Sequence, residues 1–465
     1  MRVLLPRLHG GAVAVAVMAA VTAGLCALPR RAAAQRWDVE ADAALNVGYN
    51  QQTQTVFVPD PGSPMPSDTP SSTTQTVFME IRPGILVQTG TPRLTWRAGY
   101  IFAGTLSIVG DSLSAASNQL TGALTAEVSQ FSFLTLSAVL SQGGTAFQLT
   151  SRAADSGTAE LRAPGSPDTL AATAAESMIT ELARKLTMQQ TLVASITAPQ
   201  GDLSARNSAI AASLAVDRLL DRDAIGIDVH GSVSWLTPLQ LGMTEYKSYT
   251  TSVGAHWNHD ISLNWNGMAS AGIEQVFTDT GSKPLAFLPT GALSLRYTPQ
   301  PDVGGGLDFT HGTATNLQVG SVSLTDRVGV HGAIGIDARK SRGLAFSASF
   351  LHNEPLGQVS ALVAAGTGNA VQLDAGFTTA LTRNVLGNVR YSFAYQYGQG
   401  GGLPDSLAHI FFIGVTGVLR NTDRPLAPMP MRGQRVDGGD SNFPVVEEAP
   451  EPSPGTSGTG DSPRP

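Results

Sequence analysis

Charge, cysteine and long apolar runs are all scarce in this sequence. Asp, Glu, Lys and Arg make up 14 % of the 465 residues, well below the roughly 25 % of a typical soluble domain. The formal net charge is −7, so the chain lacks the basic surface that a nucleic-acid partner would require. No apolar run of about 18 residues follows residue 34, which excludes a transmembrane helix from that part of the chain.

The N-terminal residues have the pattern of a secretory signal. Arg2 and Arg7 precede an apolar run at 11–28, and the Ala-rich segment 32–34 provides an A-x-A cleavage site. We therefore expect residues 1–34 to be a signal peptide that is removed during export. The protein would then be either a soluble periplasmic protein or a barrel in the cell outer membrane.

The single cysteine, Cys26, lies inside the predicted signal. Lipid attachment at Cys26 is disfavoured because Leu25 occupies the position where such signals carry a small residue. Without Cys26 the exported chain has no cysteine, which excludes disulfides, thiol chemistry and cysteine–metal sites. We expect no cofactor and no metal.

Apolar and polar residues alternate along most of the chain. In 37–49, WDVEADAALNVGY, the odd positions are apolar or aromatic and the even positions include three carboxylates, Asp38, Glu40 and Asp42. The same period of two recurs in RLTWRAGYIFAGTL at 93–106. This period predicts β-strands, and no long segment has a helical period.

The alternating segments predict about eighteen strands. They lie near 37–50, 75–89, 93–109, 117–129, 131–143, 175–187, 190–198, 207–217, 223–235, 249–258, 260–277, 291–298, 303–311, 324–338, 342–352, 370–382, 386–397 and 408–420.

The segments between the predicted strands alternate in length. Short ones include TGTP at 89–92, TMQQ at 187–190, DRLLDR at 217–222 and NHD at 258–260, and long ones include 51–74 and 143–174. Short turns that alternate with long loops are typical of a transmembrane β-barrel, with the turns in the periplasm and the loops outside. A soluble β-sandwich has no physical reason to keep this rhythm over so many hairpins.

The large aromatic residues lie on the apolar face of the predicted strands. All five Trp share the register of the aliphatic residues. Several aromatic residues lie near strand ends, where a membrane interface favours amphipathic rings. The predicted interface residues are Trp37, Tyr49, Trp96, Trp235, Trp257, Trp265, Tyr297, Tyr391 and Tyr397.

The opposite face of the predicted strands is polar and carries many charges. Burying these groups in a dry core would cost several kcal/mol each unless they were paired, whereas a water-filled lumen avoids that burial. We therefore predict an all-β fold, a transmembrane antiparallel up-and-down β-barrel of about 18 strands (16–18) over residues 35–420. The predicted lumen-lining residues are Asp38, Glu40, Asp42, Arg82, Arg97, Glu127, Asp228, His230, His256, Glu274, Arg296, Asp308, Arg327, His331, Asp374 and Arg390, and the main aromatic residues of this register are Phe78, Phe133 and Phe412.

With these features the chain resembles Gram-negative outer-membrane β-barrel proteins of the porin kind. The resemblance rests on the secretory signal, the apolar face with its Trp and Tyr residues, and the alternation of short turns with long loops. It covers about 35–420, and no motif indicates a subfamily. It implies an outer-membrane transport protein that contacts outer-membrane lipid and the outer-membrane assembly machinery.

One departure from the family pattern is the C-terminal segment. Barrels of this kind end on an aromatic residue, whereas here the last predicted strand is followed by residues 421–465, which are rich in Pro, Gly and Ser. This composition predicts a disordered tail. The tail would lie in the periplasm, because an even number of strands returns the chain to the side on which the barrel began. It is either a solvated tail or a tether to a periplasmic partner through NFPVVEEAP at 442–450.

The primary functional hypothesis is a passive pore for small polar solutes, because barrels of about 16–18 strands leave an aqueous channel. Opposed acids and bases across the lumen would sort such solutes. Alternatively, each of these charged residues pairs with an opposite charge and stiffens the barrel wall, without contacting a solute. The segment 143–174 is either a constriction or an ordinary external loop, and its charged residues are Arg152, Asp155, Glu160, Arg162 and Asp168.

Other functions stay open on the sequence alone. A polysaccharide-export porin would need only a wide polar tube, although the lumen register holds few aromatic rings. A non-conducting structural or surface-binding barrel would display the Pro-rich segment 51–74. A TonB-dependent transporter is disfavoured because the first predicted strand follows the signal directly.

An enzyme is also disfavoured. His230 with Ser232 and Ser234, and His352 with Glu354, are the closest approaches to a hydrolase site on the predicted strands. Neither group matches a catalytic motif or a metal-ligand spacing.

Overall fold

The computed structural model describes 37–54, 72–91, 93–110, 115–143, 169–199, 206–237, 245–279, 285–300, 303–316, 321–336, 342–356, 368–382, 384–398 and 405–420. The predicted signal peptide (1–34), the predicted tail (421–465) and the segment 144–168 lie outside these residues, and so do all five charged residues of the predicted constriction. No helix within the described ranges is long and apolar enough to cross a membrane.

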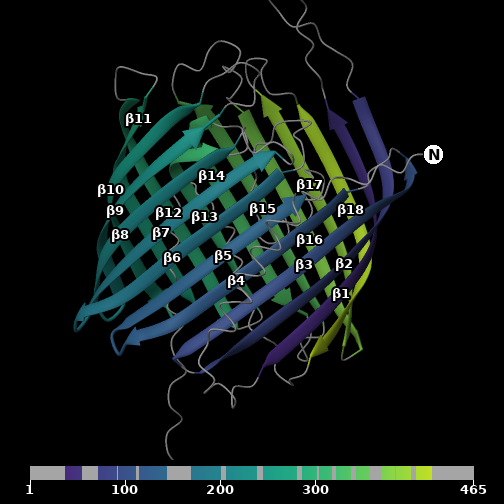
Figure 1. The fold of residues 1–465 in the computed structure, drawn as a ribbon, viewed down its shortest axis with the longest axis horizontal. Helices are drawn as coiled ribbons and strands as arrows, with labels where there is room; N and C mark the ends of the chain where they lie inside the picture. The colour runs from purple at the N-terminus through teal and green to yellow at the C-terminus, as the bar shows by residue number, and fades with distance from the viewer. Residues whose placement is uncertain are drawn as a thin grey trace, which may run out of the picture.

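Eighteen antiparallel strands form one closed sheet, and Figure 1 shows them tilted around the wall of a barrel. Each strand pairs with the next in the sequence, and β1 pairs with β18 as well as with β2. This confirms the predicted fold class and the predicted number of strands. The strands are β1 Asp38–Gln54, β2 Ser72–Thr91, β3 Leu94–Gly110, β4 Ala115–Ser129, β5 Ser132–Gly143, β6 Thr169–Ala183, β7 Leu186–Pro199, β8 Asn207–Leu219, β9 Asp223–Leu236, β10 Tyr246–Ser262, β11 Trp265–Thr278, β12 Leu285–Gln300, β13 Val303–Asn316, β14 Ser321–Gly335, β15 Arg342–Pro355, β16 Gly368–Thr382, β17 Val385–Gly398 and β18 Ser406–Arg420.

The barrel has a turn end and a loop end. Most connections at the turn end are short, such as 184–185 and 263–264, and the longest connections, such as 55–71 and 144–168, are all at the loop end. The barrel begins at Asp38 of β1 and ends at Arg420 of β18. Both residues are at the turn end because the number of strands is even. The predicted alternation of turns and loops is therefore confirmed.

The apolar register of the strands faces outward. In β1, Leu45 and Val47 are 46 % and 45 % exposed, whereas Asn46 between them is 6 % exposed. Val47 pairs with Ile413 of β18, which is also exposed, so the same face continues across the closure of the barrel. Since neighbouring side chains of a strand point to opposite faces, the polar register faces the interior.

The outward apolar surface ends abruptly near the loop end of β13–β17. One row of directly paired residues there is apolar on β13–β16 and consists of Phe309, Val328, Phe350 and Val371, followed by Tyr395 of β17. The next outward row toward the loop end is polar on the same four strands and consists of His311, Asp326, His352 and Asn369, followed by Tyr397. A sharp edge of this kind is expected where a hydrocarbon layer meets its interface.

Two predicted turns are misplaced. TMQQ at 187–190 lies within β7, and the chain turns instead at Arg184 and Lys185, where Lys185 adopts a positive φ of 66°. In this turn the Lys185 ammonium donates a hydrogen bond of 2.8 Å to Asp221 of the next turn and lowers the pKa of that carboxyl.

NHD at 258–260 lies within β10, and the chain turns at 263–264. His259 and Trp257 both bond to Asp223 of β9, which holds this polar stretch in the sheet. The segment 143–174 is also shorter as a loop than predicted, because β6 begins at Thr169.

Gly48 is required by packing on the inner wall. It pairs with Phe412 on one side and Phe78 on the other, and a Cβ at this position would overlap the Phe78 ring and the backbone oxygen of Phe411. Gly329 of β14, which is also on the inward register, is a matched contrast, since a Cβ there would meet no atom within 4 Å.

We therefore expect Gly48→Ala to lower the free energy of unfolding by about 1–3 kcal/mol, the usual effect of overpacking. Gly329→Ala should leave it unchanged. Urea unfolding of the two variants in lipid vesicles measures both effects. Equal destabilisation by the two substitutions would contradict the packing explanation.

Candidate functional site in the barrel interior

The sixteen predicted lumen residues all lie on the inward register of their strands. Their neighbours along each strand lie on the outward register, which holds exposed apolar residues such as Val229 and Ile273. They are Asp38, Glu40 and Asp42 of β1, Arg82 of β2, Arg97 of β3, Glu127 of β4, Asp228 and His230 of β9, His256 of β10, Glu274 of β11, Arg296 of β12, Asp308 of β13, Arg327 and His331 of β14, Asp374 of β16 and Arg390 of β17. Their contact with a permeating solute stays a prediction.

One group of interior charges lies on β16–β18 and β1–β2. Arg390 donates to Asp374 at 3.2 Å, and Asp374 also accepts hydrogen bonds from Gln372 and Ser392. The Arg390 guanidinium lies 5.9 Å from the centre of the Phe412 ring, a favourable cation–π geometry. The acid and base are thus paired, which makes their burial tolerable.

The closure of the barrel adds an interior ion pair. Glu40 at the start of β1 accepts a hydrogen bond of 2.6 Å from Arg420 at the end of β18. Sequence reasoning missed Arg420 because the residue ends the last strand. Its partner is identified only by the β1–β18 pairing.

A second group of interior charges is centred on His256. Its ring lies between Asp217 of β8 and Asp228 of β9, with the Nδ1–Asp228 distance at 3.2 Å. Asp217 was missed because DRLLDR at 217–222 reads as a turn, whereas β8 continues to Leu219. Farther around the wall, Asp308 accepts from Ser294 at 2.7 Å and pairs with His331 at 3.5 Å.

The interior is closely packed near the loop end of β9–β14. Leu236, Val276 and Val322 form an almost fully buried apolar cluster. Their strands, β9, β11 and β14, are not adjacent in the sheet. Contacts of this cluster therefore cross the interior between strands that are not neighbours in the sheet.

The predicted interface aromatics lie on the outward register. At the turn end, Trp37 and Trp96 meet edge to face at 6.1 Å, and Trp265 lies 4.5 Å from Tyr297. Trp257 is also at this end, Tyr49, Trp235 and Tyr397 are nearer the loop end, and Tyr391 is in the middle of β17.

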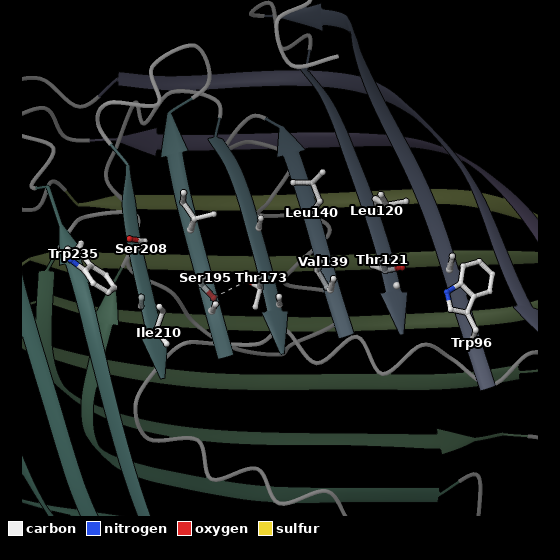
Figure 2. A pocket seen from close by; sticks show the side chains of 18 residues that line it. Trp96, Leu120, Thr121, Val139, Leu140, Thr173, Ser195, Ser208, Ile210 and Trp235 are labelled. Atoms are coloured by element: carbon white, nitrogen blue, oxygen red, sulfur yellow. Dashed lines mark hydrogen bonds between the residues drawn. The ribbon is translucent and has the colours of Figure 1, made fainter. Parts of the chain in front are cut away.

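An apolar groove of about 520 Å³ lies along the wall of β3–β9 (Figure 2). Trp96 and Trp235 lie at its two ends, and Ile196 and Ile210 line it from β7 and β8. These four residues share the outward register, so the groove belongs to the outer surface and not to the interior.

Glu176 is the one acidic or basic residue, among those the structure describes, on the outward register far from both ends of its strand. It lies at the centre of β6, directly opposite Leu136 and Leu192. The Gln190 amide donates to it at 3.4 Å. A carboxylate in such an apolar surface is costly if that surface meets lipid.

We expect Glu176→Leu to raise the free energy of unfolding in lipid vesicles by about 1–2 kcal/mol, since Leu removes a lipid-facing charge. The reciprocal substitution Leu136→Glu should lower it. Urea titration of both variants provides the measurement. A loss of stability in Glu176→Leu would show that the carboxylate is stabilised where it lies.

The histidines considered for an enzyme lie in different places. His352 is outward, and its Nδ1 lies 2.8 Å from Asn369 Oδ1. His230 is inward and its Nε2 is buried without a hydrogen-bond partner. No serine hydroxyl bonds to either ring within the described ranges, and no group of three or more His, Cys, Asp or Glu there is placed to hold a metal ion.

The buried pair Asp374–Arg390 gives a direct test of the interior network. We expect Arg390→Met to lower the free energy of unfolding by about 3 kcal/mol, because an unpaired carboxylate would remain. The double variant with Asp374→Leu should recover much of this loss. A double-mutant cycle in urea measures the coupling, and additive effects would contradict a direct interaction.

Comparisons with known proteins identify no family. No family model matches the chain, and no curated protein matches it. Among solved structures, OccAB2 of Acinetobacter baumannii is 9 % identical, with 83 % of this chain and 98 % of that chain covered and a TM-score of 0.41. OpdQ of Pseudomonas aeruginosa is 10 % identical over 82 % and 98 % with a TM-score of 0.35, and the siderophore receptor PirA of Pseudomonas aeruginosa is 10 % identical over 81 % and 80 % with a TM-score of 0.38. These likenesses are too distant to indicate an activity.

Proposed function

We propose that the protein is an outer-membrane pore that allows small polar solutes to pass by diffusion. The observation that carries this proposal is the inverted barrel wall, with apolar residues outside and charged or hydroxyl residues inside. An exposed apolar surface that surrounds the whole barrel is costly in water and favourable in lipid.

The number of strands supports the same proposal. Barrels of about eight strands fill their interior with side chains, whereas barrels of about 16–18 leave an aqueous channel. The polar inward register of this eighteen-stranded barrel is suited to contact with water. The interior charges pair with one another, as in Asp374–Arg390 and Glu40–Arg420, so a strong preference for one sign of ion is not expected.

The outer membrane is the expected location. The predicted secretory signal would carry the chain across the inner membrane. A closed sheet leaves no unpaired strand edge, and this is what permits a β-structure to cross a bilayer. The polar row from His311 to Tyr397 is suited to the interface at the loop end.

Conductance in planar bilayers tests the proposal. The purified, folded chain should give stepwise current increases in salt solution, and the same preparation unfolded by boiling should give none. A folded barrel that inserts without any conductance would contradict the pore and would indicate a structural or surface-binding barrel.

A further inference from the structure

Six hydroxyl residues form a continuous row on the inner wall of β3–β8. They are directly paired from strand to strand, one residue per strand, and we call them the hydroxyl arc: Thr95, Thr125, Thr135, Ser177, Thr191 and Ser213. They lie on the inward register, since Leu136 and Leu192, which follow Thr135 and Thr191, are exposed on the outer surface. Directly paired residues are about 4.5–5.5 Å apart, so the hydroxyls form an unbroken band.

The hydroxyls of the arc are accessible and have no partner in the protein. None of the six residues is buried, and none makes a side-chain hydrogen bond within the described residues. Inward hydroxyls nearer the loop end, in contrast, form hydrogen bonds within the protein. Thr173 and Ser195 bond to each other at 3.1 Å (Figure 2), and Thr121 donates to the backbone oxygen of Gly99.

On β5–β8 the two inward rows beside the arc carry no charge. Charged or titratable residues adjoin its ends, because Arg97 and Glu127 are the next inward residues after Thr95 and Thr125, and Ser213 pairs with His230 of β9. The inward row on its loop side consists of Ser137, Ala175, Val193 and Ala211. The inward row on its turn side consists of Phe133, Ile179, Gln189 and Ala215. The small residues of the loop-side row leave space in front of the hydroxyls.

Several charged residues elsewhere on the inner wall have partners. Asp374 with Arg390 and Glu40 with Arg420 belong to β16–β18 and β1, and Asp308 with His331 belongs to β13 and β14. Paired charges compensate one another and attract a free ion weakly. The stretch of inner wall on β5–β8 therefore offers hydroxyls in place of charges.

We propose that the hydroxyl arc is the surface along which solutes move, and that it favours uncharged, hydroxyl-bearing solutes over ions. The proposal rests on the pore function proposed above. Each Ser or Thr hydroxyl donates one hydrogen bond and accepts others, so a polyol exchanges bonds to water for equivalent bonds to the arc. On β5–β8 an ion gains no compensating charge from the arc for the hydration that it loses.

Single-cysteine labelling tests the position of the path, because the exported chain is expected to contain no other cysteine. Ser177→Cys lies on the arc, and Ser347→Cys is its matched control on the inner wall of β15, where Ser347 pairs with Asp374 and His331. Leu192→Cys places the label on the outer surface beside Thr191. Each variant, folded in vesicles, is labelled with a maleimide that carries a short polyethylene glycol.

Swelling of the vesicles in erythritol gives the readout. Labelled Ser177→Cys should slow erythritol entry at least about threefold, whereas labelled Ser347→Cys and Leu192→Cys should change it less than about twofold, because obstruction depends on where the label lies in the pore. A larger effect at Ser347→Cys would overturn the assignment of the path to the arc.

Selectivity is measured on the unmodified chain with solutes of similar size. Glycerol should enter the vesicles faster than glycerate. Faster entry of glycerate would overturn the preference for uncharged solutes. If neither solute enters and no current flows, the pore function itself fails, which is a different result from a displaced path or an inverted preference.

Discussion

The pairing of β1 with β18 is the interaction on which the rest of this structure depends. Every strand has two hydrogen-bonded neighbours only because this pairing closes the sheet. Unpaired backbone N–H and C=O groups are costly wherever water is absent. Closure removes the two open edges, and it therefore allows the outer surface to be apolar along the full circumference.

Closure also creates the interior and determines which groups meet in it. Glu40 and Arg420 are 380 residues apart in the sequence and hydrogen-bonded at 2.6 Å. Arg390, Phe412, Gly48 and Phe78 form one row across β17, β18, β1 and β2, and the absence of a side chain at Gly48 leaves space for the Phe78 ring. Farther around the wall, β5–β8 have mostly small or hydroxyl side chains on the inward register. The interior thus combines paired charges, such as Asp374 with Arg390, with a stretch on β5–β8 whose middle rows carry hydroxyls and no charge.

Most of the fold could be predicted from the sequence, because the period of two is a local property. The eighteen strands and their polarity follow from the alternation of residues within each segment. The errors occurred where polar clusters resemble turns. NHD at 258–260 is held in β10 by bonds to Asp223, and the Asp217 that begins DRLLDR bonds to His256 inside the barrel. In both places a partner on another strand satisfies the polar group, and its position depends on register.

The sequence by itself determined the strand pattern, the apolar outer face and the set of inward charged residues. These follow from side-chain chemistry and from the alternation of faces along a strand. Only the tertiary structure decided which charges are paired, which hydroxyls are free and that Glu176 lies in the middle of an apolar surface. These properties depend on the lateral register between strands, and a shift of one residue would exchange the two faces. The groups that distinguish this interior from a generic polar tube are brought together by register and closure.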